Sequence, residues 1–357
     1  MPTIGDIFRE YGQAYLSKFG ANIPDNHRRA IKAIGACRTG ALGWHVFECQ
    51  NCGEVHYVNH SCRNRSCPLC HARQRENWLS ARIGELLPVP YFHVIFTLPG
   101  ELRRIVRGNA RVLLKVLMNA AGQTLLQFGR DRRYLGGKAG VTMVLHTWTS
   151  CLEYHPHAHC LVPAGGIDGP LWRNARKGYL FPVRAMSKVF RGIFLKMAGE
   201  ALPGVQFPSE ALSRDWVVYA KPAPKNVDRL IGYLGRYVHR IAISNGRIIS
   251  MAGGRVSFSW KDSRDSKKKT TMLPVFEFMR RYLQHVLPSR FHKVRYFGFM
   301  SPSNRRRFRR VRLLLWMGAG YAFPVKERLP KEFLCRICEK GTLVKTGAVF
   351  PPSRAPP

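Results

Sequence analysis

Acidic side chains are scarce in this chain of 357 residues. Only 21 Asp and Glu stand against 58 Lys and Arg, so the formal net charge is +37. Such an excess attracts polyanions over long range and raises the rate at which they meet the protein. A basic surface that is merely solvated is the alternative, but it would still gather nucleic acid. The charge balance therefore predicts a nucleic-acid-binding protein.

Long hydrophobic runs are also missing. The best apolar stretch, residues 313–325, has 13 residues with two glycines and a proline, whereas a membrane-spanning helix needs about 18 apolar residues. The first 20 residues mix charges of both signs through their apolar positions, which is untypical of a signal peptide. We therefore expect a cytoplasmic protein without a membrane partner, in a compartment where thiols stay reduced.

Cysteine, in contrast, is frequent: the chain has ten. In a reducing compartment this number indicates metal binding rather than disulfides. Cys49 and Cys52 form one C-x2-C pair, Cys67 and Cys70 form another, and 14 residues separate the pairs. Because two such pairs can supply the four soft ligands of a tetrahedral zinc ion, we expect a structural zinc on these four cysteines.

Other cysteines leave alternatives open. Cys37 and Cys62, with His60 nearby, could form a second zinc site or could be small buried residues. Cys335 and Cys338 form a third C-x2-C pair with no partner pair near it in the sequence. Since half a site does not hold zinc, its partner would have to come from the fold or from another chain.

The order of apolar patterns predicts an α+β fold with a largely antiparallel central sheet. Residues 1–35 are expected to be helical, and the last 18 or so residues, rich in Pro, are expected to be disordered. Alternation predicts strands at residues 91–98, 141–148, 157–166, 215–221, 240–244, 246–250, 255–260 and 293–300. Three-to-four spacing predicts helices at residues 72–87, 101–130, 183–200, 226–239 and 274–287.

A histidine pair marks one of these strands. Side chains alternate between the faces of a strand, so His157 and His159 project from the same side, about 7 Å apart. Both can then bind one divalent cation while Ala158 and Cys160 point into the core. His146, on the preceding predicted strand, is the expected third ligand if the two strands pair. Histidines of a basic surface without a metal are the alternative.

A tyrosine pair marks a predicted helix. Tyr233 and Tyr237 are four residues apart, so their rings lie about 40° apart on one face. An aromatic stripe facing the core is the alternative, but several basic residues share the segment. A tyrosine hydroxyl has a pKa near 10 and is a poor nucleophile at neutral pH. A cation on the histidines would polarise a scissile phosphate, and the attack would leave a 5′-phosphotyrosine and a free 3′-hydroxyl.

These residues resemble the HUH endonuclease superfamily, and most closely the IS91-type (Y2, rolling-circle) transposases. The segments that carry the resemblance are residues 61–70, 92–99, 146–166, 233–244, 261–270 and 278–299.

The resemblance implies an HUH endonuclease-like core, preceded by a small cysteine-rich zinc module. It also implies nicking and transfer of single-stranded DNA at transposon ends and targets, in a DNA-associated bacterial protein. His157 and His159 would hold Mg²⁺ or Mn²⁺, and Tyr233 and Tyr237 would be the nucleophiles. The spacing of His146 is similar to that in the three-histidine clusters of conjugative relaxases.

The expected domains are a helical segment over residues 1–35, a zinc-binding domain with its connecting helix over 36–87, a catalytic domain over 88–300 and a basic region over 301–357. The alternatives are a zinc-dependent DNA-binding protein without catalysis and a related replication initiator or relaxase. The basic residues expected to contact DNA are Arg236, Arg240, Lys267, Lys268, Lys269, Arg305, Arg306 and Arg307.

Overall fold

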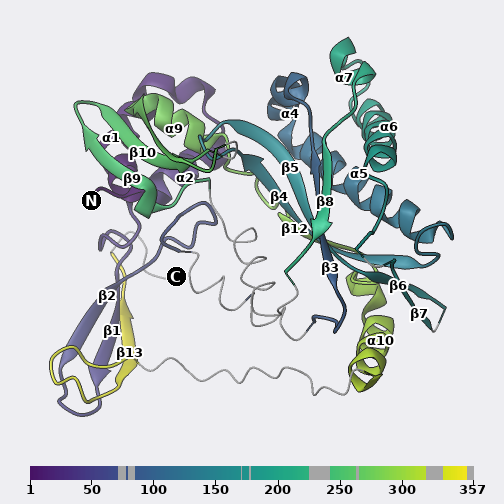
Figure 1. The fold of residues 1–357 in the computed structure, drawn as a ribbon. Helices are drawn as coiled ribbons and strands as arrows, with labels where there is room; N and C mark the ends of the chain where they lie inside the picture. The colour runs from purple at the N-terminus through teal and green to yellow at the C-terminus, as the bar shows by residue number, and fades with distance from the viewer. Residues whose placement is uncertain are drawn as a thin grey trace. The chain divides into compact units, whose positions relative to one another are not determined.

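The computed structural model describes residues 1–70, 78, 85–169, 171–176, 178–224, 242–262, 265–318 and 333–351. The chain divides into two compact units (Figure 1). The first comprises Met1–Gln74, Ile243–Val286 and Lys326–Pro357, and the second comprises Arg75–Ala242 and Leu287–Val325. Residues 243–286, which the sequence analysis placed in the 88–300 domain, thus belong to the same unit as the cysteine-rich N-terminal region.

The second unit is built on a seven-stranded antiparallel sheet. Its strands run in the order β7-β6-β4-β5-β3-β8, and β12 also pairs with β4. The α+β class and the antiparallel sheet predicted from the sequence are therefore confirmed. The strands are β3 (Tyr91–Thr97), β4 (Lys138–Trp148), β5 (Tyr154–Pro163), β6 (Gly165–Asp168), β7 (Leu171–Asn174), β8 (Val218–Pro222) and β12 (Val294–Gly298).

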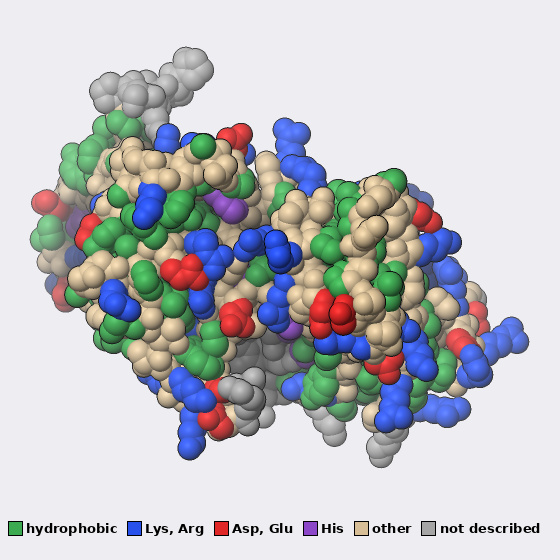
Figure 2. All heavy atoms as spheres, turned by 90° about the horizontal axis from the view of Figure 1, so that it is seen from above, with side chains coloured by type: hydrophobic (Ala, Val, Ile, Leu, Met, Phe, Trp, Pro, Cys, Tyr) green, Lys and Arg blue, Asp and Glu red, His purple; other side chains and the backbone are tan. Residues whose placement is uncertain are grey.

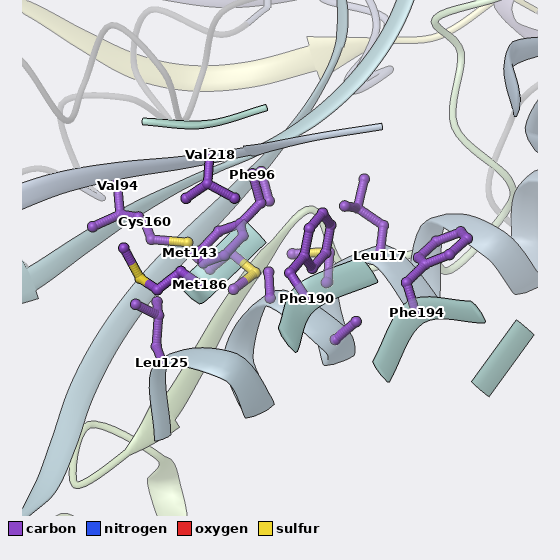
Figure 3. Packing of buried hydrophobic residues seen from close by; sticks show 14 of the residues in the cluster. Val94, Phe96, Leu117, Leu125, Met143, Cys160, Met186, Phe190, Phe194 and Val218 are labelled. Carbon is purple, nitrogen blue, oxygen red and sulfur yellow. The ribbon is translucent and has the colours of Figure 1, made fainter. Parts of the chain in front are cut away.

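Helices cover one face of this sheet: α4 (Arg103–Gly108), α5 (Ala110–Arg130), α6 (Val183–Ala201) and the short α7 (Ser209–Ser213). Alternate residues of the strands bury their side chains against α5 and α6 in the main core (Figure 3). Val94 and Phe96 come from β3, and Phe190 and Phe194 come from α6. The core therefore holds one face of β3, β4 and β5 rigid, and their other residues project from the opposite face.

Two glycines allow β12 to lie close to its neighbours. Gly298 has a φ of 65°, and a Cβ there would lie 1.7 Å from the carbonyl oxygen of Ala139. A Cβ on Gly122 of α5 would lie 2.6 Å from the ring of Phe297. Only glycine fits both positions, since any side chain would collide.

Part of the opposite face of the sheet is covered by a smaller apolar cluster. It contains Leu161 of β5 and Tyr91 of β3, together with Phe299 and with Phe308 of α10 (Arg305–Gly318). Helix α10 was not expected from the sequence, where its first residues were interpreted only as a basic run. The short turn η4 (Pro302–Asn304) leads into it.

The first unit contains α1 (Ile4–Phe19), α2 (Asp25–Gly35) and α9 (Val275–Leu283), together with two three-stranded sheets. Thr3 and Asp6 cap α1 reciprocally. Tyr282 of α9 is fully buried; its ring contacts Phe8 edge-on at 5.3 Å, and its hydroxyl donates to the carbonyl oxygen of Ser66. Helix α9 therefore anchors the cysteine-rich loop that precedes Cys67.

One sheet of this unit runs β11-β10-β9, formed by β9 (Ile248–Ala252), β10 (Arg255–Lys261) and β11 (Lys268–Pro274). The other runs β13-β1-β2, formed by β1 (Trp44–Cys49), β2 (Val55–Asn59) and β13 (Leu343–Val349). Neither β11 nor any strand of the second sheet was predicted. The strand expected at 240–244 is absent from residues 242–244, and residues 240–241 lie outside the described part.

The C-terminal prediction of disorder is wrong for residues 343–349. These residues form β13, which pairs antiparallel with β1 from Cys49↔Leu343 to Trp44↔Val349. The composition of the tail is rich in Pro and small residues, but the backbone of β1 supplies the hydrogen-bonding partner that composition does not reveal. Among the described residues, no helix is long and apolar enough to cross a membrane.

Candidate active site and cysteine clusters

Three histidines meet on the face of the large sheet opposite the main core. Strands β4 and β5 pair with His146 directly across from His157, and His159 follows two residues later on β5. One ring nitrogen from each lies within 4.8 Å of those of the other two. The rings of His146 and His159 are 4.5 Å apart at their centroids, and those of His157 and His159 are 4.8 Å apart. The structure thus brings together the three residues expected as ligands.

Burial prepares these imidazoles to bind a cation. It lowers the pKa of His157 to about 4, so this side chain is neutral at pH 7 and keeps a lone pair. The Nδ1 of His157 lies 2.6 Å from the carbonyl oxygen of His155. Because a carbonyl can only accept, Nδ1 carries the proton, and Nε2 is the free ligand atom. His146 and His159 are themselves 3% and 9% exposed, so most of their surface is out of contact with bulk water.

His93 is a site residue that sequence reasoning missed. Its Nε2 lies 2.9 Å from Nδ1 of His159, and the two rings are stacked. Burial, with a smaller effect of Lys221, lowers the pKa of His93 to about 4. In the pairing of β3 with β5, Ile95 faces His159, so His93 shares that face two residues away. The alternation along residues 91–98 predicts that His93 and Ile95 share one face of the strand. Only the pairing register of β3 with β5 shows that this places His93 next to His159.

His155 points to a different partner. Its Nδ1 lies 3.3 Å from a guanidinium nitrogen of Arg103, which donates to it. Burial and the nearby Arg103 charge lower the pKa of His155. The trio is therefore bordered by a fixed positive charge at Arg103.

The donor set fits a divalent metal ion. Three neutral nitrogen donors from two rigid strands define one side of a coordination sphere and leave positions open for oxygen ligands such as phosphate and water. His93 can hold the ring of His159 by accepting a hydrogen bond from Nδ1, which leaves Nε2 for the metal. A site with open positions is suited to catalysis rather than to stabilising the fold.

Eight of the ten cysteines form two clusters, and neither is the expected one. One consists of Cys37, Cys62, Cys67 and Cys70, and the other consists of Cys49, Cys52, Cys335 and Cys338; in each, all four Sγ atoms lie within 4.8 Å of one another. The prediction that Cys49 and Cys52 share a site with Cys67 and Cys70 is therefore wrong in its pairing. The donor sets and the reduced thiols fit structural zinc.

Strand β2 explains why the two C-x2-C pairs separate. Cys49 ends β1 and Cys52 lies in the turn that leads to β2, and the five residues of β2 then carry the chain about 16 Å away. Cys62 joins Cys70 there at 3.5 Å, and Cys37 lies 3.6 Å from Cys70. His60, predicted beside Cys37 and Cys62, is outside the cluster, since its Nδ1 contacts the carbonyl oxygen of Leu42 and its Nε2 contacts His45.

Backbone amides favour the metal-binding form of one cysteine in the second cluster. The N–H groups of Lys340 and Gly341 lower the pKa of Cys338 to about 6. This lowering favours the thiolate, which is the form that binds zinc.

The predicted DNA-contacting residues differ in their surroundings. Lys269 is paired with Asp262 at 2.7 Å and with Asp265 at 3.2 Å, whereas Lys267 and Lys268 are exposed. Figure 2 shows many more Lys and Arg than Asp and Glu side chains on the face it presents.

The basic residues of α10 are also on the surface. Arg305, Arg306 and Arg307 are exposed, although Arg307 donates to the carbonyl oxygen of Gly169. Phe308, which stacking on DNA would require to be exposed, is instead buried and lies parallel to Phe299 at 6.0 Å. Tyr233, Tyr237, Arg236 and Arg240 lie outside the described residues.

Comparison with known proteins agrees with these features. A family model described as a putative transposase matches residues 140–307, and a model described as a transposase zinc-binding domain matches residues 7–98. The chain is 38% identical to the putative transposase y4qJ of Sinorhizobium fredii, over all of this chain and 97% of that protein. It is 28% identical to the transposase for insertion sequence element IS801 of Pseudomonas savastanoi pv. phaseolicola, over 81% of this chain and 73% of that protein. No solved structure matches the chain.

Proposed function

We propose that this chain, which belongs to the IS91 family of transposases, nicks and transfers single-stranded DNA at the ends of an insertion sequence. The observation that carries the proposal is the meeting of His146, His157 and His159 on one face of the sheet, with their ligand atoms within 4.8 Å of one another. A purely structural zinc site would be closed by four ligands, whereas three leave room for a substrate oxygen.

Each described residue of the site has a role in this proposal. His157 is held neutral by burial and oriented by its hydrogen bond to the carbonyl oxygen of His155, so Nε2 is the atom that would bind the cation. His93 fixes the ring of His159. A divalent cation bound there, Mg²⁺ or Mn²⁺, would polarise the scissile phosphate and offset the charge of the transition state. Arg103 places a further positive charge beside His155.

Tyr233 and Tyr237 are the proposed nucleophiles. In this HUH-type, rolling-circle mechanism, the phenolic oxygen attacks phosphorus and forms a 5′-phosphotyrosine, while the P–O3′ bond breaks and leaves a free 3′-hydroxyl. A 3′-hydroxyl then attacks the phosphotyrosine, which releases the tyrosine and joins the DNA. Two tyrosines on one helical face would let one hold a strand while the other cleaves; which acts first is open. Intact His and Tyr pairs favour this function over a zinc-dependent DNA-binding protein without catalysis.

The test is to incubate the full chain with labelled single-stranded DNA carrying the element's ends, with Mg²⁺, with Mn²⁺ and without either. We expect a covalent protein–DNA adduct that needs the cation and disappears in the Tyr233→Phe/Tyr237→Phe and His157→Ala/His159→Ala double variants. Tyr179→Phe and His292→Ala, at exposed positions, are matched controls that should keep it. DNA binding without any adduct, across all ends and cations, would establish the non-catalytic alternative instead.

A further inference from the structure

Cys335 and Cys338 lie against a pair of cysteines from the other end of the chain. The Sγ of Cys338 is 3.6 Å from that of Cys49, and the Sγ of Cys335 is 3.8 Å from that of Cys52. A tetrahedral zinc ion with Zn–S bonds of about 2.3 Å separates its sulfurs by about 3.8 Å. A disulfide would require about 2.05 Å. The spacing is therefore that of a four-thiolate metal site and not that of oxidised pairs.

The loops around these sulfurs supply hydrogen bonds to thiolates. The backbone N–H of Ile337 points at Cys335 at 3.4 Å, and that of Gly341 points at Cys338 at 3.3 Å. The N–H of Asn51 does the same for Cys49 at 3.4 Å. The Nε2 of His56 lies 3.2 Å from Cys335. Zinc with four thiolates has a net charge of −2, so donors arranged in this way stabilise the filled site.

Gly341 allows the two halves to approach. A Cβ at this position would lie 2.3 Å from the Sγ of Cys49 and 2.6 Å from the Cβ of Asn51. The Sγ of Cys49 is a proposed ligand, and Asn51 lies in the turn between the proposed ligands Cys49 and Cys52. Neither residue can therefore move aside without opening the cluster. A glycine three residues after the second cysteine is thus required by the close contact between segments far apart in the sequence.

We propose that Cys49, Cys52, Cys335 and Cys338 bind a second zinc ion, and that this ion fastens the C-terminal segment 333–351 to the N-terminal β1–β2 hairpin. The family matches end at residues 98 and 307, so the matched zinc-binding domain contains only half of this site. The other half comes from 289 residues further along the chain, as measured between Cys49 and Cys338.

The sheet next to the cluster shows what the metal would hold. Strand β13 continues directly from the cysteine turn and pairs with β1 along its length (Figure 1). Most of its residues are exposed, so it buries little apolar surface, and hydrogen bonds to β1 are its main attachment. Closing a loop of this length costs conformational entropy that a few exposed pairs offset poorly. Loss of zinc should therefore release β13 while β1 and β2 remain paired.

Metal content tests the site itself. Native mass spectrometry of the full chain should find two zinc ions, one for each cluster. The Cys335→Ser/Cys338→Ser variant should keep one ion, and the Cys151→Ser control, at a cysteine outside both clusters, should keep two. A single zinc ion in the unchanged protein, or two in the double variant, would overturn the proposal.

Amide hydrogen exchange tests whether the zinc ion fastens β13 to β1. In the double variant, amide protection should fall at residues 343–349 and remain unchanged in α5. Gly341→Ala, which keeps all four cysteines, should show the same local loss and weaker zinc retention. Protection of 343–349 that survives the loss of the second ion would contradict the fastening role. Neither measurement involves DNA, so failure here is distinguishable from failure of the proposed strand-cleavage function.

Discussion

The histidine trio and the second cysteine cluster are two proposed metal sites built in different ways. The trio comes from 14 consecutive residues, 146–159, that form two paired strands. Its neutral nitrogen ligands leave coordination positions open. The cluster joins cysteines 289 residues apart, and its four sulfurs can close a tetrahedron. An open set of three neutral donors suits an exchangeable ion that meets a substrate, whereas four thiolates suit an ion that stays and holds the fold.

Metal removal should give the largest difference between the histidine trio and the cysteine cluster. A short treatment with EDTA is expected to reduce DNA cleavage to background, because three imidazoles hold a hard cation weakly. Both zinc ions should remain, since thiolate sites bind zinc far more tightly. Adding Mn²⁺ or Mg²⁺ back should restore cleavage, which a gel assay and metal analysis of the same sample would measure. If activity returned only with zinc, the division between the sites would break down.

His93 offers a finer test of the histidine site. Replacing it with Ala removes the acceptor for the Nδ1–H of His159, and a lost partner of this type typically weakens metal binding by about 10–100-fold. We therefore expect the Mn²⁺ concentration for half-maximal cleavage to rise by that factor, with the rate largely recovered at saturating metal. His93→Gln, whose side-chain oxygen can accept the same hydrogen bond, should retain part of the affinity. An unchanged metal requirement in His93→Ala would limit His93 to a packing role.

The smallest effect is expected on DNA affinity, from replacing a lysine of the unit that contains the cysteine clusters. Lys268 is exposed, whereas Lys269 is engaged by Asp262 and Asp265. Lys268→Ala should weaken binding to single-stranded DNA a few-fold and reduce the salt slope by about 0.7, the value for one lost phosphate contact. Lys269→Ala should change DNA affinity less and should lower protein stability, because it leaves the buried Asp262 without this lysine. Fluorescence anisotropy at several salt concentrations, alongside thermal unfolding, would measure both. A larger loss of affinity from Lys269→Ala would reverse this assignment.

Features that depend on residues close together along the chain could be predicted from the sequence, whereas features that depend on residues far apart could not. Parity within β5 placed His157 and His159 on one face and Ala158 in the core, because side-chain alternation is a local property of a strand. The short turn between two strands made His146 a reasonable third ligand. In contrast, the exposed strands β1, β2 and β13 have no clear alternation in burial, so the apolar pattern did not reveal them. Phe308 lies among arginines in the sequence, which gives no sign that the fold buries it against Phe299.

The sequence by itself determined the charge of this protein, its α+β class, the three histidines that meet on one face of the large sheet and its transposase family. Each of these depends on composition, on alternation within a strand or on residues close along the chain. Only the tertiary structure decided which cysteines share a cluster and that His93 contacts His159. The three C-x2-C pairs, with Cys37 and Cys62, can be combined into four-cysteine sites in several ways, and their spacing does not distinguish these combinations. The extended course of β2 and the return of the C-terminal segment to β1 select one combination, because ligands must lie within a few ångströms of one ion.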